Sequence, residues 1–390
     1  MFLAYGLVWM DRYSVIYLFP FISNEMDLTN SDLGSAMSIV AITWGISSLV
    51  FSVLSDKLGS KKIFLILAIL TFSLSTFLSG FVTTFGMLLI LRGIMGIAEG
   101  PAIPLIQSTI MAESSAKRKG LNVGLVLGGA AILGKGLTPI LATIIGSHFD
   151  WRVAFYVLAI PGFIIVLLLM KYMREPIQQS KDKPKIKLAD YKVILTNKNI
   201  LLSLFGASLY MAFLFSFTTF LPLFLIEIAE YSETKTGTIL NIFGLVLFIW
   251  NIVVGIISDK IGRKSTLIIF SLISCLIPLS VLFFYSNFVL LLISLIIFAA
   301  GLGYQTLVMF VIPGESVPKV LTASAMALVI LVGEVIGGAA GPYISGVLSD
   351  TYTLAASMWI SFAFSLALFG LSFFYNETAP FKINKQFKTA

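Results

Sequence analysis

The chain has 390 residues, of which 58% are apolar and only 12% are charged, and its mean hydropathy is +0.99. A soluble protein carries about 25% charged residues, so the composition indicates an integral membrane protein. The single cysteine, Cys275, and the single histidine, His148, exclude a disulfide framework and any metal site built on clustered Cys and His ligands. The net charge of +7 would suit nucleic-acid binding, but the positions of the charges explain it otherwise.

Twelve apolar stretches are long enough to cross a bilayer as helices, which takes about 20 residues. They cover 1–23, 31–55, 61–83, 86–111, 119–146, 152–173, 198–226, 236–258, 265–285, 288–313, 320–348 and 353–375. The first lacks a basic leader and carries a charge pair at its centre, so we expect a first helix and not a cleaved signal peptide.

A polar, basic and proline-broken segment divides these stretches into two sets of six. The sequence therefore predicts an all-α integral membrane protein with twelve transmembrane helices in two six-helix bundles. The expected parts are an N-terminal bundle (1–173), a cytoplasmic linker (174–197), a C-terminal bundle (198–375) and a cytoplasmic tail (376–390).

Lysine and arginine collect in the loops after the even-numbered stretches, in the linker and in the tail. The opposite loops carry acidic residues instead, among them Glu25, Asp27, Glu227 and Glu230. Because basic loops stay in the cytoplasm, both termini are expected there, in a multi-pass protein of the cell membrane. The positive charge is thus a topology signal that needs no nucleic-acid partner.

The loop after the second stretch is repeated after the eighth. "LSDKLGSKK" occupies 54–62 and "ISDKIGRKS" occupies 257–265, which places Asp56 and Asp259 203 positions apart. Two equal halves with the same loop predict a parallel repeat about an axis along the membrane normal. The candidate gating residues are Asp56, Lys57, Gly59, Asp259, Lys260, Gly262 and Arg263. Alternatively, these residues only mark topology.

These two loops resemble the signature of the major facilitator superfamily, Gly-x-x-x-Asp-Arg/Lys-x-Gly-Arg/Lys-Arg/Lys. The second copy fits it fully from Gly255 to Lys264, whereas the first departs from it at Ser52 and Ser60. The resemblance covers all twelve stretches. It implies the major facilitator fold and transport by alternating access.

Six ionisable residues lie deep within the apolar stretches. They are Asp11, Arg12, Arg92, Glu99, Lys135 and Glu334. Such residues usually face a bundle interior, pair with one another and mark a transport path. Arg92 and Glu99 are two helical turns apart and share one face of their helix. The alternative is an ion pair that only holds the first and fourth helices together.

"WMDRYSVIYLFPFI" and "LRGIMGIAEGPAIP" are similar to the anion:cation symporter branch of that superfamily, which includes sugar-acid/proton symporters. The resemblance implies that Arg12 meets the substrate carboxylate and that Asp11 and Glu99 exchange protons. Arg92 and Glu334 are expected to assist that proton coupling.

Two residues depart from the branch. Lys135 is either a second anion contact or a neutralising partner of Glu334 or Glu99, and Glu334 either takes a second proton or binds a hydroxyl-rich substrate. Further candidate substrate contacts are Tyr17, Gln107, Tyr210, Tyr304 and Gln305, with Asn241 and Asn251 as additional polar groups. For the tyrosines, a packing or interfacial role is the alternative.

The sequence thus predicts a transporter that is no enzyme: a proton-coupled symporter of a small organic anion, such as a sugar acid. It is expected to act as a monomer in the lipid bilayer, driven by a proton gradient, with neither metal nor cofactor. One alternative is an organophosphate/phosphate exchanger, although 200–226 lacks the cation of such relatives. The other is a drug:proton antiporter, although the fifth stretch lacks the Gly-Pro pair typical of that class.

Overall fold

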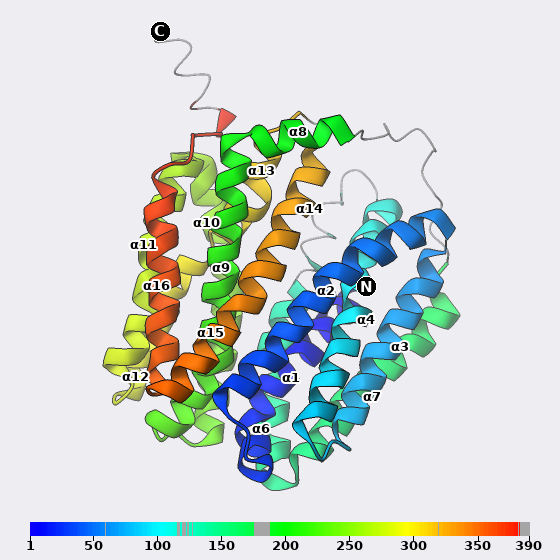
Figure 1. Ribbon diagram of the computed structural model, residues 1–390, viewed down its shortest axis with the longest axis vertical. Helices are drawn as coiled ribbons and strands as arrows, with labels where there is room; N and C mark the ends of the chain where they lie inside the picture. Colours follow the sequence, from blue (N-terminus) through cyan, green and yellow to red (C-terminus); the bar gives the residue numbers. More distant parts are fainter. Residues whose placement is uncertain are drawn as a thin grey trace. The chain divides into compact units, whose positions relative to one another are not determined.

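The computed structural model describes most of the chain as helices (Figure 1). The described residues are 1–58, 60–114, 118, 122, 125–126, 128–174, 188–318, 320–380 and 382. Their contacts divide the chain into two compact units. Unit 1 comprises 1–181, 219–245 and 342–351, and unit 2 comprises 182–218, 246–341 and 352–390.

The helices of unit 1 begin with α1 (Phe2–Met26), α2 (Asn30–Leu58), α3 (Lys61–Ser79), α4 (Phe85–Glu113), the π-helical segment η1 (Ala130–Leu137), α6 (Thr138–His148) and α7 (Trp151–Tyr172). It is completed by the end of α9 (Lys198–Leu223), the π-helical segment η2 (Phe224–Ile228), the first half of α10 (Glu233–Ile261) and most of α15 (Gly338–Thr351). Unit 1 therefore combines the first half of the chain with one end of later helices.

Unit 2 contains the other helical segments. They are α8 (Leu188–Thr196), most of α9 (Lys198–Leu223), the second half of α10, α11 (Arg263–Phe284), α12 (Phe288–Phe298), the 3₁₀ segment η3 (Ala299–Leu302), the π-helical segment η4 (Leu307–Val311), α13 (Ile312–Glu315), α14 (Thr322–Val332), the π-helical segment η5 (Gly333–Gly337) and α16 (Ala355–Ser372). The short helix α8 lies crosswise to α9 (Figure 1). It occupies part of the predicted linker, for which no helix was expected.

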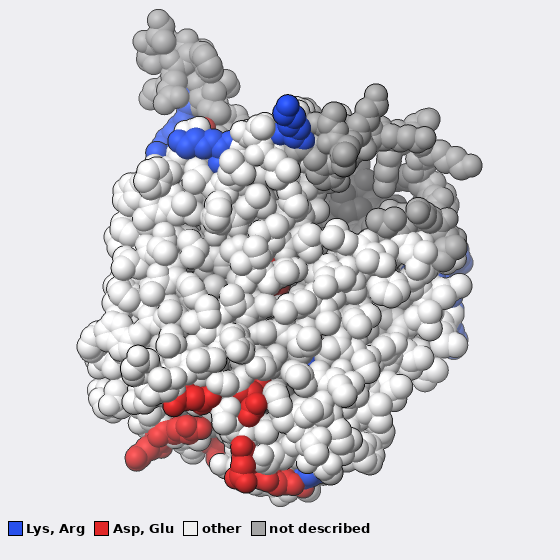
Figure 2. All heavy atoms as spheres, viewed as in Figure 1, with Lys and Arg blue, Asp and Glu red and all other residues white. Residues whose placement is uncertain are grey.

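Eleven helical stretches among the described residues are long and apolar enough to cross a membrane, and α1 is a further helix of 25 residues. The prediction of an all-α membrane protein is confirmed. The charge pair and the tyrosines of α1 lower its hydropathy below that of the other spans. On the face drawn in Figure 2, charged side chains are few and most of the surface is uncharged.

Several spans begin at side-chain caps. Thr84 accepts a hydrogen bond from the N–H of Met87 at the start of α4, and Asp150 accepts one from the N–H of Arg152 at the start of α7. Such caps satisfy N–H groups that have no partner within the helix. They explain why these spans begin within one residue of the predicted positions.

Helix α4 packs between α2 and α3 in unit 1. Its glycines allow the approach to α2, because a Cβ at Gly96 would lie 2.7 Å from the carbonyl oxygen of Val40 and one at Gly100 would lie 2.5 Å from that of Trp44. Small residues let membrane helices come this close. The packing fixes the face of α4 that carries Arg92 and Glu99.

Candidate functional site

Four charged residues of α1 and α4 form a buried cluster in unit 1. Asp11 and Arg12 are each 2% exposed, and Arg92 and Glu99 are fully buried. Arg92 interacts electrostatically with Glu99, Asp11 and Arg12. We call these four residues the charge cluster. Charges buried this deeply are costly unless they compensate one another.

Arg92 binds the backbone of α1. Its Nη2 donates to the carbonyl oxygen of Arg12 at 2.8 Å, and its Nη1 donates to that of Asp11 at 3.3 Å. The hydroxyl of Ser14 also donates to the carbonyl of Asp11, at 2.7 Å. A single guanidinium thus joins the middle of α4 to the middle of α1. The sequence indicated the shared location of these charges but not the main-chain contacts.

Aromatic rings form a ladder along α1. Tyr5, Trp9, Tyr13 and Tyr17 follow one another at four-residue spacing, with ring centroids 6.5, 5.8 and 6.2 Å apart. The Cζ atom of Arg12 lies 5.5 Å from the centre of the Trp9 ring. This is the geometry of a cation–π contact. Trp9 and Tyr13 were not among the predicted site residues, although their spacing is visible in the sequence.

Lys135 lies in η1, which packs against α1. Its Nζ is 5.8 Å from the centre of the Tyr13 ring. Two glycines allow η1 to pack closely on both sides of Lys135. A Cβ on Gly134 would lie 2.6 Å from the Cβ of Trp9, and one on Gly244 would lie 2.6 Å from the Cβ of Lys135. The amide of Asn241 donates to the carbonyl of Gly136 at 2.8 Å. Such π-helical turns often occur at functional positions.

The other candidates of unit 1 lie on the same two helices as the charge cluster. Tyr17, on α1, is 7% exposed, and Gln107, on α4, is half-buried. Gln107 follows Glu99 by about two helical turns. The structure therefore keeps both polar groups on helices that meet at the cluster.

The candidates of unit 2 form a group of their own. The hydroxyl of Tyr210 donates to the carbonyl of Leu302 at 3.0 Å and lies 3.5 Å from Oε1 of Gln305. The rings of Tyr210 and Tyr304 meet edge to face with centroids 5.2 Å apart. These contacts are typical of packing within a helix bundle.

Glu334 lies in the π-helical segment η5 and is 4% exposed. Lys135 occupies the same kind of segment, η1, in unit 1. The amide of Asn251 donates within α10 to the carbonyl of Leu247 at 2.9 Å. Asn251 therefore bonds to its own helix in this structure.

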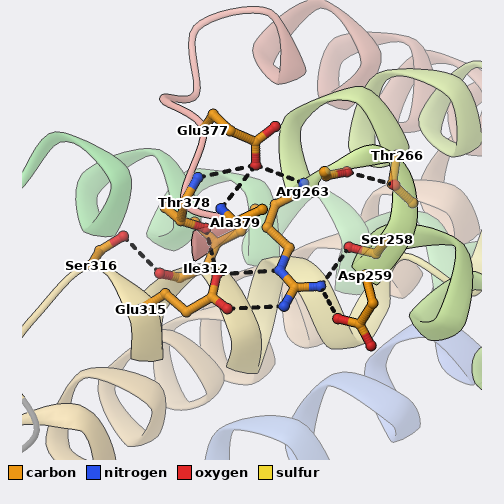
Figure 3. A network of polar contacts seen from close by, with 11 residues as sticks. Ser258, Asp259, Arg263, Thr266, Ile312, Glu315, Ser316, Glu377, Thr378 and Ala379 are labelled. Carbon is orange, nitrogen blue, oxygen red and sulfur yellow. Dashed lines mark hydrogen bonds and ion pairs between the residues drawn. The ribbon is translucent and has the colours of Figure 1, made fainter. Parts of the chain in front are cut away.

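The second loop copy is centred on Arg263, at the start of α11 (Figure 3). Its guanidinium donates to Asp259 at 2.5 Å, to Ser258 at 3.1 Å and to both oxygens of Glu315 at 2.9 and 3.2 Å. Gly262 has a φ of 98°, which favours glycine. Lys260 is exposed.

A segment just after α16 packs on this loop (Figure 3). Glu377 accepts hydrogen bonds from the backbone N–H groups of Arg263, Thr378 and Ala379 at 2.7, 3.1 and 3.0 Å. The hydroxyl of Thr378 donates to Glu315 at 2.6 Å. Sequence reasoning missed Glu315 and Glu377, because neither belongs to the repeated motif. In the first copy, Gly59 and the side chains of Asp56 and Lys57 lie outside the described part of the chain.

The model of the Major Facilitator Superfamily matches residues 1–335 and 230–389. The chain belongs to this superfamily. Its superfamily and its many apolar helices make it a multi-pass membrane transporter and not an enzyme.

Named relatives are transporters of small molecules. The hexuronate transporter of Bacillus subtilis (strain 168) is 27% identical over 303 residues, which is 74% of this chain and 71% of that protein. A probable 4-methylmuconolactone transporter of Cupriavidus pinatubonensis (strain JMP 134 / LMG 1197) is 27% identical over 393 residues, covering 94% of this chain and 87% of that protein.

The fold is similar to that of a bacterial homologue of the human lysosomal transporter Spinster, solved in an inward-facing and unoccupied conformation. The TM-score is 0.82 at 17% sequence identity, over 95% of this chain and 94% of that one. At this identity the likeness shows the shared fold alone.

Proposed function

We propose that this superfamily member is a proton-coupled symporter of a small organic carboxylate. The observation that carries the proposal is the charge cluster, in which two arginines and two carboxylates lie buried on facing helices. A structural ion pair would need one residue of each sign. We assign the additional arginine to binding of the anion and the additional carboxylate to binding of the proton, because a symporter must bind both.

Arg12 is the proposed anion site. It is 2% exposed, and its guanidinium lies over the Trp9 ring. A fixed cation lowers the cost of bringing a carboxylate out of water, and a guanidinium can hold that carboxylate through two hydrogen bonds. Two hydrogen-bond donors of the Arg92 guanidinium already bind carbonyl oxygens of α1. We therefore assign a structural role to Arg92 and the substrate contact to Arg12, whose guanidinium lies over an aromatic ring.

Glu99 is the proposed proton site, with Asp11 as its neighbour. Asp11 and Glu99 interact electrostatically with each other and with Arg92. Two close carboxylates are stable together only if a cation or a proton compensates them. Arrival of the anion at Arg12 would remove part of that compensation and favour proton uptake, so anion and proton would enter together.

The proposed setting is the cell membrane, driven by the proton gradient, with both termini in the cytoplasm. The support is the loop charge: in unit 1, acidic residues such as Glu25 and Asp32 mark one end of the helices and basic residues such as Lys61 and Lys171 mark the other. Basic loops face the cytoplasm. The two relatives, a hexuronate transporter and a probable 4-methylmuconolactone transporter, support an organic acid as substrate.

The test is uptake by purified protein in proteoliposomes. The panel contains radiolabelled sugar acids, dicarboxylates and phosphate esters, with an inward proton gradient and with or without a protonophore. We expect accumulation of a carboxylate that the protonophore abolishes. Accumulation of a phosphate ester in exchange for phosphate would replace the proposal by organophosphate/phosphate exchange.

Arg12→Ala tests the residue assignment in the same assay. Because the substrate would lose its main counter-charge, we expect equilibrium binding to fall at least tenfold. Arg174→Ala, which removes an exposed cation just after α7, is the matched control and should bind as the parent does. Binding of equal strength in both variants would show that Arg12 is not the anion site.

A further inference from the structure

Two cations lie over neighbouring rungs of the aromatic ladder of α1. The guanidinium of Arg12 is 5.5 Å from the Trp9 ring, and the ammonium of Lys135 is 5.8 Å from the Tyr13 ring. The Trp9 and Tyr13 rings are stacked, with centroids 5.8 Å apart and an angle of 26° between their planes. The edges of the two stacked rings thus form an apolar surface with a cation near each ring.

The position of Lys135 is built into the backbone. The π-helical turn of η1 places Gly134 directly against Trp9, and Gly244 leaves room for the lysine stem. Within the described part of unit 1, no carboxylate lies within ion-pairing distance of the Lys135 ammonium. A half-buried cation held in place by packing and contacting a ring is suited to bind an anion.

Trp9 adds a hydrogen-bond donor to the same surface. Its Nε1 is buried and has no hydrogen-bond partner among the described residues. A buried donor without a partner is uncommon, because leaving it unsatisfied costs free energy. A carboxylate or hydroxyl oxygen lying on the ladder would satisfy it.

The charges of unit 1 indicate how many negative charges the surface can take. Arg12, Arg92 and Lys135 are cations, and Asp11 and Glu99 are acids. With both acids ionised, this set has one net positive charge, and uptake of one proton raises it to two. A substrate with two negative charges then leaves a neutral site, whereas a monoanion leaves one positive charge uncompensated away from water.

From these observations we infer that the substrate is an open-chain dicarboxylate. One carboxylate meets Arg12, the other meets Lys135, and the chain between them lies along the edges of the Trp9 and Tyr13 rings. The inference rests on the proposed symport of carboxylates and deepens it by naming the class of acid. It also gives Lys135 the role of a specificity residue.

The test compares D-glucarate with D-gluconate, which share a carbon chain and differ in having two carboxylates or one. Equilibrium binding to the purified parent protein is measured for both acids. We expect at least tenfold tighter binding of D-glucarate. Equal binding of the two acids, or tighter binding of D-gluconate, would overturn the dicarboxylate inference while leaving carboxylate symport in place. No binding of any acid in the panel would contradict the proposed function itself.

Lys135→Met removes the ammonium and keeps a flexible side chain of similar length. We expect it to weaken D-glucarate binding at least tenfold and to leave D-gluconate binding within twofold of the parent. The matched control is Lys171→Met, because Lys171 is exposed and also lies over a tyrosine ring, that of Tyr172, at 5.1 Å. Equal loss of both acids in Lys135→Met would show a general structural role and contradict the inference. The parent comparison stands even if this variant fails to fold.

Discussion

The carboxylate of Asp350, in the last turn of α15, holds the first turn of α2 at Ser31. It accepts hydrogen bonds from the backbone N–H of Ser31 at 2.8 Å, from that of Asn30 at 2.9 Å and from the Ser31 hydroxyl. Both segments belong to unit 1. A carboxylate at a helix N-terminus satisfies free N–H groups and interacts favourably with the helix dipole, which stabilises by about 0.3–1 kcal/mol.

Asp350→Asn is expected to loosen this contact, because the side chain loses its charge. In alternating access, helix ends that pack together must separate once per cycle. We therefore expect the thiol of Asn30→Cys, in a Cys275→Ser background, to react several-fold faster with a membrane-impermeant maleimide. Glu233→Gln removes a charge at the start of α10 in the same unit and should leave the rate unchanged. Equal rates in all variants would show that the hydrogen bonds of Asp350 do not restrict the separation of these helix ends.

Glu315 and Asp259 both bind Arg263, but they should matter unequally. Glu315 binds the guanidinium through two oxygens and its side chain is 25% exposed, whereas the Asp259 side chain is 68% exposed. Bidentate, partly buried pairs are stronger than exposed ones. We expect Glu315→Gln to slow transport several-fold and Asp259→Asn to slow it less than twofold. Initial rates of uptake test this, and a larger effect of Asp259→Asn would reverse the ranking.

Glu377→Ala should release the segment that follows α16. Three backbone N–H groups lose their acceptor in this variant. Lys382 loses the carboxylate 3.6 Å from its ammonium and keeps the hydrogen bond to the Ser265 hydroxyl. We expect faster tryptic cleavage at Lys382, followed by mass spectrometry. Glu230→Ala removes an acidic residue from a different part of the chain and is the control. Cleavage at the parental rate in Glu377→Ala would show that Thr378 and its neighbours hold the segment without the carboxylate.

Arg92→Met is expected to destabilise the protein strongly. It removes two hydrogen bonds to α1 and leaves Asp11 and Glu99 without their shared cation. Breaking a buried charge pair typically costs about 3–5 kcal/mol. Adding Glu99→Gln should restore part of the thermal stability, because one uncompensated charge disappears. Thermal unfolding of the two variants measures this, and an equally unstable double variant would mean that Arg92 acts only through the α1 carbonyl groups.

The spans were predictable from the sequence because hydropathy and loop charge act over 20 residues at a time. The interruptions within the spans were not. Helix α4 runs unbroken through Pro101 and Pro104, whereas π-helical turns occur at Gly-rich sequences around Lys135 and Glu334. Which glycine or proline changes the helix depends on the helix that packs against it, and a single sequence does not contain that information.

The charge cluster was predictable in part. Burial of Asp11, Arg12, Arg92 and Glu99 follows from their depth in apolar spans, and the seven-residue spacing on α4 places two of them on one face. The bond from Arg92 to the α1 carbonyl groups was not predictable, since main-chain acceptors leave no mark in a sequence. Contacts such as that of Asp350 with Ser31 join residues over 300 positions apart and require the fold itself.

Glu99 is the residue on which the proposed coupling depends most. It is fully buried on α4, about 10 Å and two helical turns from Arg92 on the same face. Glu99→Gln keeps the shape of the protonated acid but can neither gain nor lose the proton. We therefore expect substrate binding within threefold of the parent and complete loss of acid-driven accumulation. Exchange of internal for external substrate should continue, because it requires no net release of a proton.

Glu113→Gln is the matched control, since it lies on the same helix but is exposed at its end. It should accumulate substrate as the parent does when the outside is acidified. The decisive measurement is the ratio of internal to external substrate in proteoliposomes at a fixed pH difference. If Glu99→Gln still concentrates substrate under that gradient, Glu99 is not the coupling acid. Proton transfer must then depend on Asp11, its neighbour in the cluster, or on Glu334, which is also buried but belongs to unit 2.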